Sequence, residues 1–562
     1  MSDDDSIPSI DAIFVARFDT RRGNALEWSN AVPGIRLDGV EYSALPSGLH
    51  SSSKDVIYFC LDGCIGVAVF VNEPTDSMEH RGARMVSVGV LVKPSSETGR
   101  CGQVWRHVSF LENRARHHVI GDADTSDLSD YFGRHRAPPH VPGPSSPSSS
   151  KRDSYRAMNL RRISRSFTLS EPLQATQTTM MGFQGSQEAE DIPASHPSQH
   201  FLELVQTMGP AVSVLWKAAL LKKRILIYTP PPIEAACLAV YNICLMASVP
   251  FGVTSASPIR SSERIQPLFC VGIHDIDVLM AFRGGYVACT TDKLFLFKPQ
   301  LYDVFVDLSA STVQETYSTH KVAHPKIKVV GMVREEQGLL DVGLHFADRR
   351  RYYTLLQHLG RYRRQQEWAH RRLFADTASS ATEQDYDAST SFQGSQHPEQ
   401  CKGGTAAANG FNISDMLRKM ITGGWWWWYG DDDADEDDYE RLIPNKDAQD
   451  SALDTQNEGP SLSGACLQVL QTQAHGNMDT EAIRFFHNCT RTLLSDLGGL
   501  ISYKATTAIF AETEAGEDGP NQKIAISRED IHLLGLDPSR DSDFVRDLAR
   551  VLLQTGLRGE TV

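Results

Sequence analysis

The chain has 562 residues, of which 41% are hydrophobic, and its formal net charge is −15. A chain of this length can bury a sizeable core and is expected to form two or three domains. The negative charge is concentrated, because residues 376–480 hold nineteen Asp and Glu against five Lys and Arg, which leaves about −1 for all other residues. A nucleic-acid footprint is therefore not expected on the folded parts.

The cysteines and the apolar runs favour a cytoplasmic protein. The ten cysteines form no CxxC pair and no zinc-ligand spacing, and most of them stand in apolar runs, as expected of reduced core residues. The first residues are acidic, at Asp3, Asp4 and Asp5, so no signal peptide is predicted. The run from Ile233 to Val249 contains two polar residues and follows three prolines, so no membrane span is predicted there. We expect no metal and no cofactor.

Residues 7–125 are predicted to form an antiparallel α+β module of a longin-like or similar type. Apolar strands are expected at Ala12–Phe18, Val56–Phe59, Ile65–Val71 and Met85–Val92. The second and third of these are separated by an Asp-Gly pair, which is a strong hairpin signal. A helix from Trp105 to His118 completes the module, with Val104, Val108 and Leu111 on its buried side.

Residues 126–198 are predicted to be a disordered linker. Residues 137–150 contain five prolines and five serines, a composition that cannot bury enough apolar surface to become ordered. Further along, Ser164 and Ser166 follow arginines in a pattern that basophilic kinases use. Both serines are candidate phosphorylation sites, and an unmodified segment is the alternative.

Residues 199–375 are predicted to form a central α/β module. Val212, Leu215, Trp216 and Ala219 have the spacing of one buried helical face, and the short apolar strand Ile225–Tyr228 follows. Three prolines end this strand and lead into a second helix. A strand that is apolar on both faces and flanked by helices is typical of a covered, mostly parallel sheet. From the pattern alone, the segment fits the core of many α/β domains.

More strands are expected in the same module, and polar residues follow one of them. The predicted strands are Leu268–Ile273, Tyr286–Thr290, Leu294–Phe297 and Val304–Leu308. His274, Asp275 and Asp277 stand just beyond the first of them, where side chains of an open α/β sheet meet ligands or partners. Such residues are equally often helix caps, so both roles stay open.

An arginine-rich helix closes the module, with eight arginines from Arg349 to Arg372 and an apolar stripe. The stripe consists of Tyr352, Leu355, Leu356, Leu359 and Tyr362. Its basic face is either solvated or a dock for an acidic partner, such as an anionic lipid or a GTPase.

Residues 376–479 are predicted to be a disordered acidic insertion, and residues 480–562 a C-terminal helical region. The insertion contains four consecutive tryptophans, Trp425 to Trp428, beside the run DDDADEDDYE. We hypothesise that the tryptophans dock on the folded body and the acids meet the arginine-rich helix. In the C-terminal region Ala482, Phe485, Phe486, Cys489 and Leu493 form one apolar stripe, and a second helix is expected after Pro538.

The wording of several segments resembles DENN-domain proteins, in particular their small LCHN-like branch. The central stretch VLWKAALLKKRILIYTPPP is similar to the corresponding run of that branch. FDTRRGNALEW, VEYSALPSGLH, DVIYF and RGARMVSVGVL resemble its N-terminal module in the same order, and the C-terminal region resembles that of fungal LCHN-like proteins. The linker after residue 136 and the insertion after residue 375 interrupt the family pattern.

The resemblance implies a Rab-type small GTPase as partner. Many DENN proteins act as guanine-nucleotide exchange factors in membrane trafficking, and the GTPase lies across the N-terminal and central modules. The expected contact residues are Arg21, Arg22, Asn24, Arg81, Arg84, His274 and Asp275. The protein would be cytoplasmic, with peripheral contact to endomembranes, and its oligomeric state is left open.

No covalent chemistry is expected. The sequence contains no phosphate loop, no G-x-G-x-x-G after a strand, no H-E-x-x-H and no G-x-S-x-G. An exchange factor needs none of these, because it acts by binding the nucleotide-free GTPase more tightly than the nucleotide-bound form. The alternative is a scaffold or pseudo-exchange factor that binds a GTPase without releasing its nucleotide.

Overall fold

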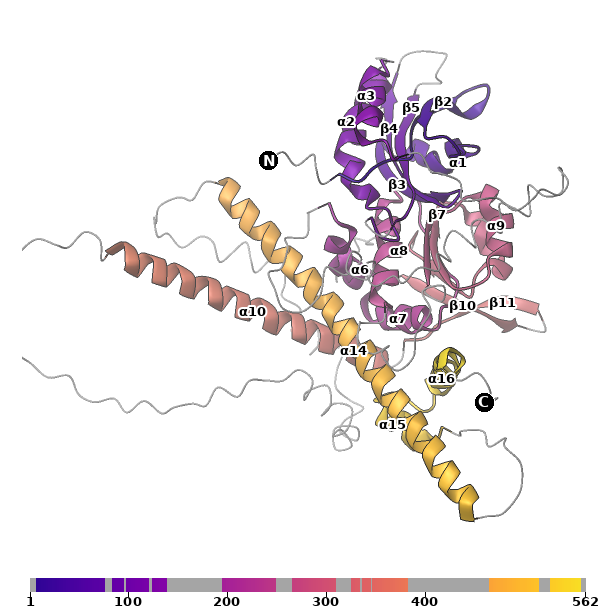
Figure 1. Cartoon of the computed structure of the whole chain (residues 1–562), viewed down its shortest axis with the longest axis vertical. Coiled ribbons are helices and arrows are strands. Elements are labelled where there is room, and N and C mark those ends of the chain that lie inside the picture. Colours follow the sequence, from indigo (N-terminus) through magenta and orange to yellow (C-terminus); the bar gives the residue numbers. More distant parts are fainter. Residues whose placement is uncertain are drawn as a thin grey trace, which may run out of the picture. The chain divides into compact units, whose positions relative to one another are not determined.

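The structure is a computed structural model, in which residues 7–75, 83–95, 98–120, 124–138, 195–248, 265–309, 325–333, 336–344, 346–382, 464–514 and 526–556 are described (Figure 1). The chain divides into two compact units. The first comprises residues 1–359, 475–522 and 547–562, and the second comprises 360–474 and 523–546. The predicted phosphorylation sites, the tryptophan cluster and the acidic run lie outside the described residues.

The first part of the sheet is antiparallel, as predicted. Its strands are β1 (Ala12–Asp19), β2 (Gly23–Ala31), β3 (Lys54–Leu61), β4 (Cys64–Pro74) and β5 (Ala83–Val92). They lie in the order β3-β4-β5-β1-β2, and every neighbouring pair among them is antiparallel. The predicted Asp-Gly hairpin is confirmed, since Asp62 and Gly63 connect β3 to β4 with φ angles of 47° and 80°.

Helices cover this part of the sheet. They are α1 (Val40–Ala44), η2 (Leu49–Ser51), η4 (Val104–His107), α2 (Val108–Ile120) and α3 (Ser126–His135). Figure 1 shows α2 and α3 on one face and α1 on the other. The predicted helix at 105–118 is confirmed, but it begins with the 3₁₀ turn η4, and Val108 is only half-buried whereas Val104 and Leu111 are buried.

The central part of the sheet is mostly parallel, as predicted. Strands β6 (Ile225–Tyr228), β7 (Gln266–Cys270), β8 (Tyr286–Thr290) and β9 (Val304–Asp307) run parallel to one another. All four residues of β6 are buried, as a strand covered on both faces requires. The predicted helices on either side of β6 are confirmed as α7 (Val212–Leu220) and α8 (Glu234–Met246).

Short helical elements connect these strands. They are η5 (Pro197–His200), α6 (Phe201–Met208), η6 (Gly209–Ala211), η9 (Ile273–Asp275), α9 (Ile276–Ala281), η10 (Lys293–Phe297) and η11 (Pro299–Leu301). The predicted strand Leu294–Phe297 is wrong, because these residues belong to the 3₁₀ helix η10. Only Phe295 of the run is buried, while Leu294 and Phe297 are exposed, so the run lacks the alternating burial of a strand. β7 also ends earlier than predicted, at Cys270.

The two parts form a single eleven-stranded sheet. Its order is β11-β10-β9-β6-β8-β7-β3-β4-β5-β1-β2, in which β10 (Lys326–Val333) and β11 (Glu336–Asp341) form an antiparallel hairpin beside β9. We call β1–β5 with their helices the N-terminal half and β6–β11 with theirs the central half. The halves meet where β3 lies parallel to β7, with one register pair, Phe59 and Cys270. This junction is called the seam below.

A C-terminal helix packs on the central half. The last helices are α10 (Phe346–Thr382), α14 (Gly464–Glu514), α15 (Arg528–Leu533) and α16 (Ser542–Gly556). The side chains of Ala482, Phe485, Phe486 and Leu493 are buried, which confirms the predicted stripe on α14 apart from the half-buried Cys489. The indole Nε1 of Trp216 donates to Thr490 Oγ1 at 2.9 Å, which joins α7 to α14. Among the described helices, none is long and apolar enough to cross a bilayer.

Candidate functional site

The turn between β1 and β2 presents two arginines. Asp19 Oδ1 accepts the backbone N–H groups of Arg21 and Arg22 at 2.7 and 2.8 Å. These hydrogen bonds lower the pKa of Asp19, so its carboxylate holds the tight turn at neutral pH. Both arginine side chains are exposed. The Asp19 carboxylate thus holds the backbone of the turn, and the side chains of Arg21 and Arg22 face solvent.

Asn24 fastens this hairpin to α1. Its Nδ2 donates to the carbonyl oxygen of Leu45 at 2.8 Å, directly after the last residue of α1. A free carbonyl at a helix end needs such a donor. The half-buried Asn24 side chain is therefore occupied in positioning α1, and its role is internal.

His274 reaches the same helix from the central half. Its Nε2 lies 3.3 Å from Ser43 Oγ of α1, and its ring centroid lies 5.8 Å from that of Tyr42. Asp275 accepts the Gly272 backbone N–H at 2.9 Å, as a helix cap does. Burial raises the pKa of Asp275, although His274 and the Gly272 N–H act in the opposite direction. The loop after β7 therefore contains a cap and also a contact between the halves.

The structure thus gathers some of the predicted residues and separates others. Arg21, Arg22 and Asn24 share one hairpin, and Asn24 and His274 both contact α1 or the residue after it. Arg84 lies apart, because its Nη1 donates to the Val119 carbonyl near the end of α2, on the other face of the sheet (Figure 1). Arg81 lies outside the described residues.

Sequence reasoning missed two exposed apolar side chains at this place. Tyr42 of α1 is 48% exposed and contacts the His274 ring, and Ile273 of η9, the residue before His274, is 50% exposed. Tyr42 belongs to a run that resembles the DENN family, but one sequence does not tell which side of a five-residue helix faces solvent. We call Tyr42, Ile273 and His274 the seam surface.

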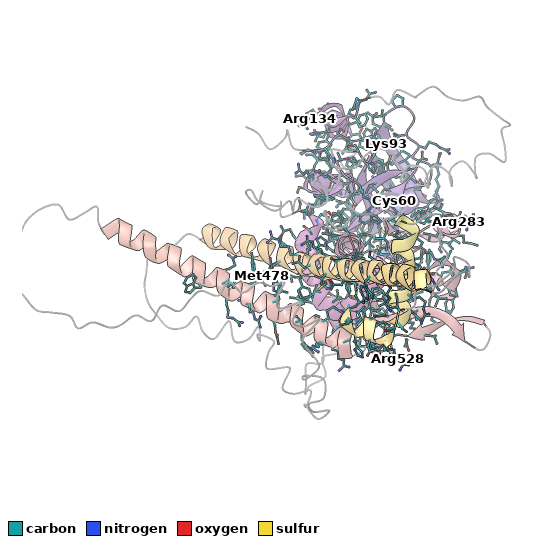
Figure 2. The ribbon with its side chains drawn as sticks, turned by 60° about the horizontal axis from the view of Figure 1, so that its bottom comes forward. Cys60, Lys93, Arg134, Arg283, Met478 and Arg528 are labelled. Atoms are coloured by element: carbon teal, nitrogen blue, oxygen red, sulfur yellow. The ribbon has the colours of Figure 1, made fainter. Side chains whose placement is uncertain are left out.

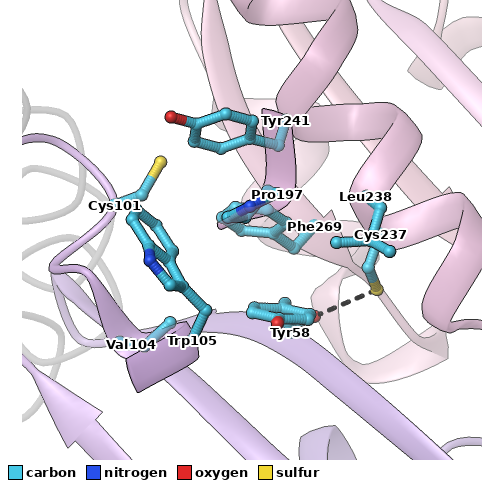
Figure 3. A pocket seen from close by; sticks show the side chains of 9 residues that line it. All are labelled: Tyr58, Cys101, Val104, Trp105, Pro197, Cys237, Leu238, Tyr241 and Phe269. Carbon is cyan, nitrogen blue, oxygen red and sulfur yellow. Dashed lines mark hydrogen bonds between the residues drawn. The ribbon is translucent and has the colours of Figure 1, made fainter. Parts of the chain in front are cut away.

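Elsewhere the seam is filled by aromatic rings (Figure 3). Trp105 of η4 and Tyr241 of α8 meet edge to face, with centroids 5.7 Å apart, and Tyr58 of β3 lies beside Phe269 of β7 at 5.7 Å. The spaces between the nine lining side chains total about 200 Å³ and are too narrow for a water molecule. Figure 2 labels Cys60, which lies on β3 beside this packing. At these nine residues the two halves are closely packed.

The seam surface lacks the geometry for covalent catalysis. Ser43, His274 and Asp275 resemble a Ser-His-Asp set, but both the serine and the aspartate contact the same ring nitrogen, Nε2, at 3.3 and 3.2 Å. A working triad needs the carboxylate on Nδ1, so that Nε2 is left for the hydroxyl. The described His, Cys, Asp and Glu side chains form no group suited to a metal.

Burial makes three of the described cysteines poor nucleophiles. Burial raises the pKa of Cys64 and Cys101 to about 12 and that of Cys489 to about 11. These groups are thiols at neutral pH, and thiols are poor nucleophiles. Cys237 and Cys289 lie 3.6 Å apart in the core as buried thiols.

Comparison with known proteins identifies the family. Residues 13–318, more than half of the chain, match the family model described as DENN domain-containing protein 11. The chain is 34% identical over 301 residues to DENN domain-containing protein 11 of Xenopus laevis, covering 53% of this chain and 59% of that protein. It is 33% identical over 327 residues to the Mus musculus protein of the same name, covering 58% of this chain and 62% of that one.

A fungal relative is more distant. The uncharacterized protein ANR2 of Saccharomyces cerevisiae is 25% identical over 347 residues, covering 55% of this chain and 60% of the relative. The chain thus spans about three fifths of the length of these relatives. The match includes β1 through β9 and both sides of the seam. The chain therefore belongs to the DENN domain-containing protein 11 family.

Proposed function

We propose that the chain is an exchange factor or regulator for a Rab-family GTPase in membrane trafficking. DENN-domain proteins as a family are associated with binding Rab GTPases and with nucleotide exchange on them, and the family match includes both halves of the sheet. We infer further that the N-terminal half is a longin-like module and that the protein works in the cytoplasm, in peripheral contact with endomembranes.

The observation that carries the proposal is the seam surface. Tyr42 and Ile273 come from different halves and are about half exposed, and Tyr42 lies against the ring of His274, the residue that follows Ile273. A large aromatic side chain beside an aliphatic one is the kind of pair that anchors a protein interface. Arg21 and Arg22, on the hairpin that Asn24 ties to α1, add exposed positive charge to the same half. A GTPase that lies across the seam would contact both halves at once.

Exchange requires differential binding and no bond chemistry. A protein that binds the nucleotide-free GTPase more tightly than the GDP-bound form lowers the affinity for GDP by the same factor, because binding free energies are linked. The seam surface supplies contacts without a nucleophile or metal, which is sufficient for this mechanism. The second candidate is a scaffold or effector that uses the same surface and binds both nucleotide states alike.

The test is capture of Rab GTPases by the purified full chain. A panel of these GTPases is presented in GDP-bound and nucleotide-free form, and release of a fluorescent GDP is followed for each one captured. Preference for one empty GTPase with faster GDP release establishes exchange. Capture without faster release assigns the scaffold role, and a panel without any capture refutes both.

Two variants locate the interface. Tyr42→Ala should weaken capture about tenfold or more, since truncating an interface anchor commonly costs 2 kcal/mol or more. Ile120→Ala is the matched control, because Ile120 is a large apolar residue that is 78% exposed at the end of α2. Equal capture by the wild type and Tyr42→Ala would remove the seam surface as the contact site.

A further inference from the structure

The seam is bridged by few backbone bonds and several side chains. Between β3 and β7 there is one register pair, whereas β4 and β5 share ten. Side-chain contacts supplement it. They include Ser43 with His274, Cys60 Sγ with the Pro267 carbonyl at 3.6 Å, and Arg100 Nη2 with the Ile265 carbonyl at 3.0 Å. Because so few residues pair between β3 and β7, the angle between the halves depends on side-chain contacts, both these and the aromatic packing of Tyr58 with Phe269 and of Trp105 with Tyr241.

A buried carboxylate also bridges the seam. Asp55 of β3 is 1% exposed, and its Oδ2 accepts the Ile233 N–H at 2.7 Å. Its Oδ1 accepts the N–H groups of Glu234 and Val56 at 3.1 and 2.9 Å. Hydrogen bonds that involve a charged group are stronger than those between neutral groups, and this carboxylate accepts three of them. Asp55 thus binds the first residues of α8 from the opposite half.

This carboxylate replaces the usual cap of α8. Helix N-termini are normally capped by an Asp, Asn, Ser or Thr of the same segment, but the N-cap residue of α8 is Ile233, which has no acceptor. The partial positive charge of the helix N-terminus favours an anion at this place. Pro231, just before the helix, also packs on the N-terminal half, against Gly48. If Gly48 carried a Cβ, that atom would lie 3.3 Å from the Cγ of Pro231. The start of α8 is therefore fixed to β3.

We propose that Asp55 is a positioning residue that sets the angle between the halves, and with it the separation of Tyr42 and Ile273 on the seam surface. The inference rests on the proposed GTPase-binding function. α1, which carries Tyr42, packs on β3, the strand that carries Asp55. η9, which carries Ile273, follows β7. A shift of β3 relative to α8 and β7 therefore moves the two contact residues relative to each other.

The test combines a distance with an affinity. Asp55→Asn keeps the size of the side chain but places an amide NH₂ against a backbone N–H, so at least one of the three bonds is lost. Spin labels attached by bio-orthogonal chemistry at the exposed positions Ser29 and Gln300, one in each half, report the distance between the halves. The affinity is measured for the GTPase that the panel identifies, in its nucleotide-free form.

The matched control is Asp303→Asn. Asp303 is more exposed than Asp55 but is likewise hydrogen-bonded, and its partner is Arg224 within the central half. Both variants lose a carboxylate and some stability, but only Asp55→Asn changes the seam. The Kd should rise about fivefold or more for Asp55→Asn, the usual scale of coupling between linked sites. It should stay within about twofold for Asp303→Asn, and the label distance should change only in Asp55→Asn.

The outcomes separate the two claims. An unchanged label distance and an unchanged Kd in folded Asp55→Asn overturn the positioning role and leave the proposed function standing. If no GTPase binds the wild type, the proposed function fails, and the label distance still decides whether Asp55 sets the angle. If Asp55→Asn does not fold, Asp55→Ser, which keeps a shorter acceptor, is measured in its place with the same criteria.

Discussion

The contact between α7 and α14 gives a sharp prediction for stability. Trp216 is 2% exposed, its Nε1 donates to Thr490 Oγ1 at 2.9 Å, and the guanidinium of Arg351 lies 5.3 Å from its ring centroid. Thr490→Val leaves the indole N–H buried without an acceptor, which should cost about 1–2 kcal/mol in the free energy of unfolding. Trp216→Phe leaves the Thr490 hydroxyl unpaired and shrinks the side chain, so about 2–4 kcal/mol is expected.

The double variant distinguishes this hydrogen bond from simple loss of volume. With both partners removed, a phenyl ring faces a valine and no buried polar atom is left unpaired, so the cost should fall short of the summed single costs by about 1–2 kcal/mol. Urea unfolding of the full chain, followed by circular dichroism, measures all four free energies. Ser495→Ala, at an exposed position of α14, serves as the control and should change little. Additive costs, or a neutral Thr490→Val, would refute the bond and the position of α14.

Three further predictions concern single groups. Burial lowers the pKa of His107 to about 3, whereas the pKa of an unfolded histidine is about 6.5. The free energy of unfolding should therefore be highest above pH 6.5 and should fall by about 2 kcal/mol between pH 7.5 and 5. His107→Asn should lose this pH dependence, which urea titrations at the two pH values measure. Partial burial would raise the pKa of Asp303, but the hydrogen bonds from Arg224 outweigh this effect and lower the pKa. Asp303→Asn should therefore melt at a lower temperature than the wild type at pH 7. The difference in melting temperature should disappear as the pH falls below about 4. A Cβ at Gly285 would overlap the backbone carbonyl oxygen of Lys222, so Gly285→Ala should lower the free energy of unfolding by about 3 kcal/mol or more. Gly343 has open space around it, so Gly343→Ala should change the free energy of unfolding little in the same melts.

The sequence predicted the local elements where periodicity and turn chemistry agreed. The apolar run of β6 between two amphipathic helices and the Asp-Gly turn after β3 both leave one plausible conformation. The predicted strand at Leu294–Phe297 was wrong because a continuous apolar stretch is compatible with a strand and with a 3₁₀ turn. In the structure only Phe295 of this stretch is buried, which fits the 3₁₀ turn. The β10–β11 hairpin was not recognised from the pattern.

The seam could not be predicted, because it depends on residues that are far apart in the chain. Asp55 bonds to Ile233, and Ser43 contacts His274, across separations of 178 and 231 residues. The residues that flank Asp55 in the sequence do not indicate that its partner is the start of a helix in the other half. Likewise, the arginine at position 84 looks like an exposed cation in the sequence, yet it is bonded to α2. The order of the motifs indicated the family, whereas the side-chain roles required the fold.

A site built from two halves also bears on the choice between the two proposed functions. A GTPase changes the shape of its contact surface when nucleotide leaves, so a surface whose halves hold a fixed angle can fit one form better than the other. If the chain is an exchange factor, Asp55→Asn should weaken binding of the nucleotide-free form more than binding of the GDP form and should slow GDP release at saturating concentration of the chain. If the chain is a scaffold, the affinities for both GTPase forms should fall by the same factor, because the variant then loses contacts that both forms share. The ratio of the two affinities in this one variant thus decides between differential and uniform binding.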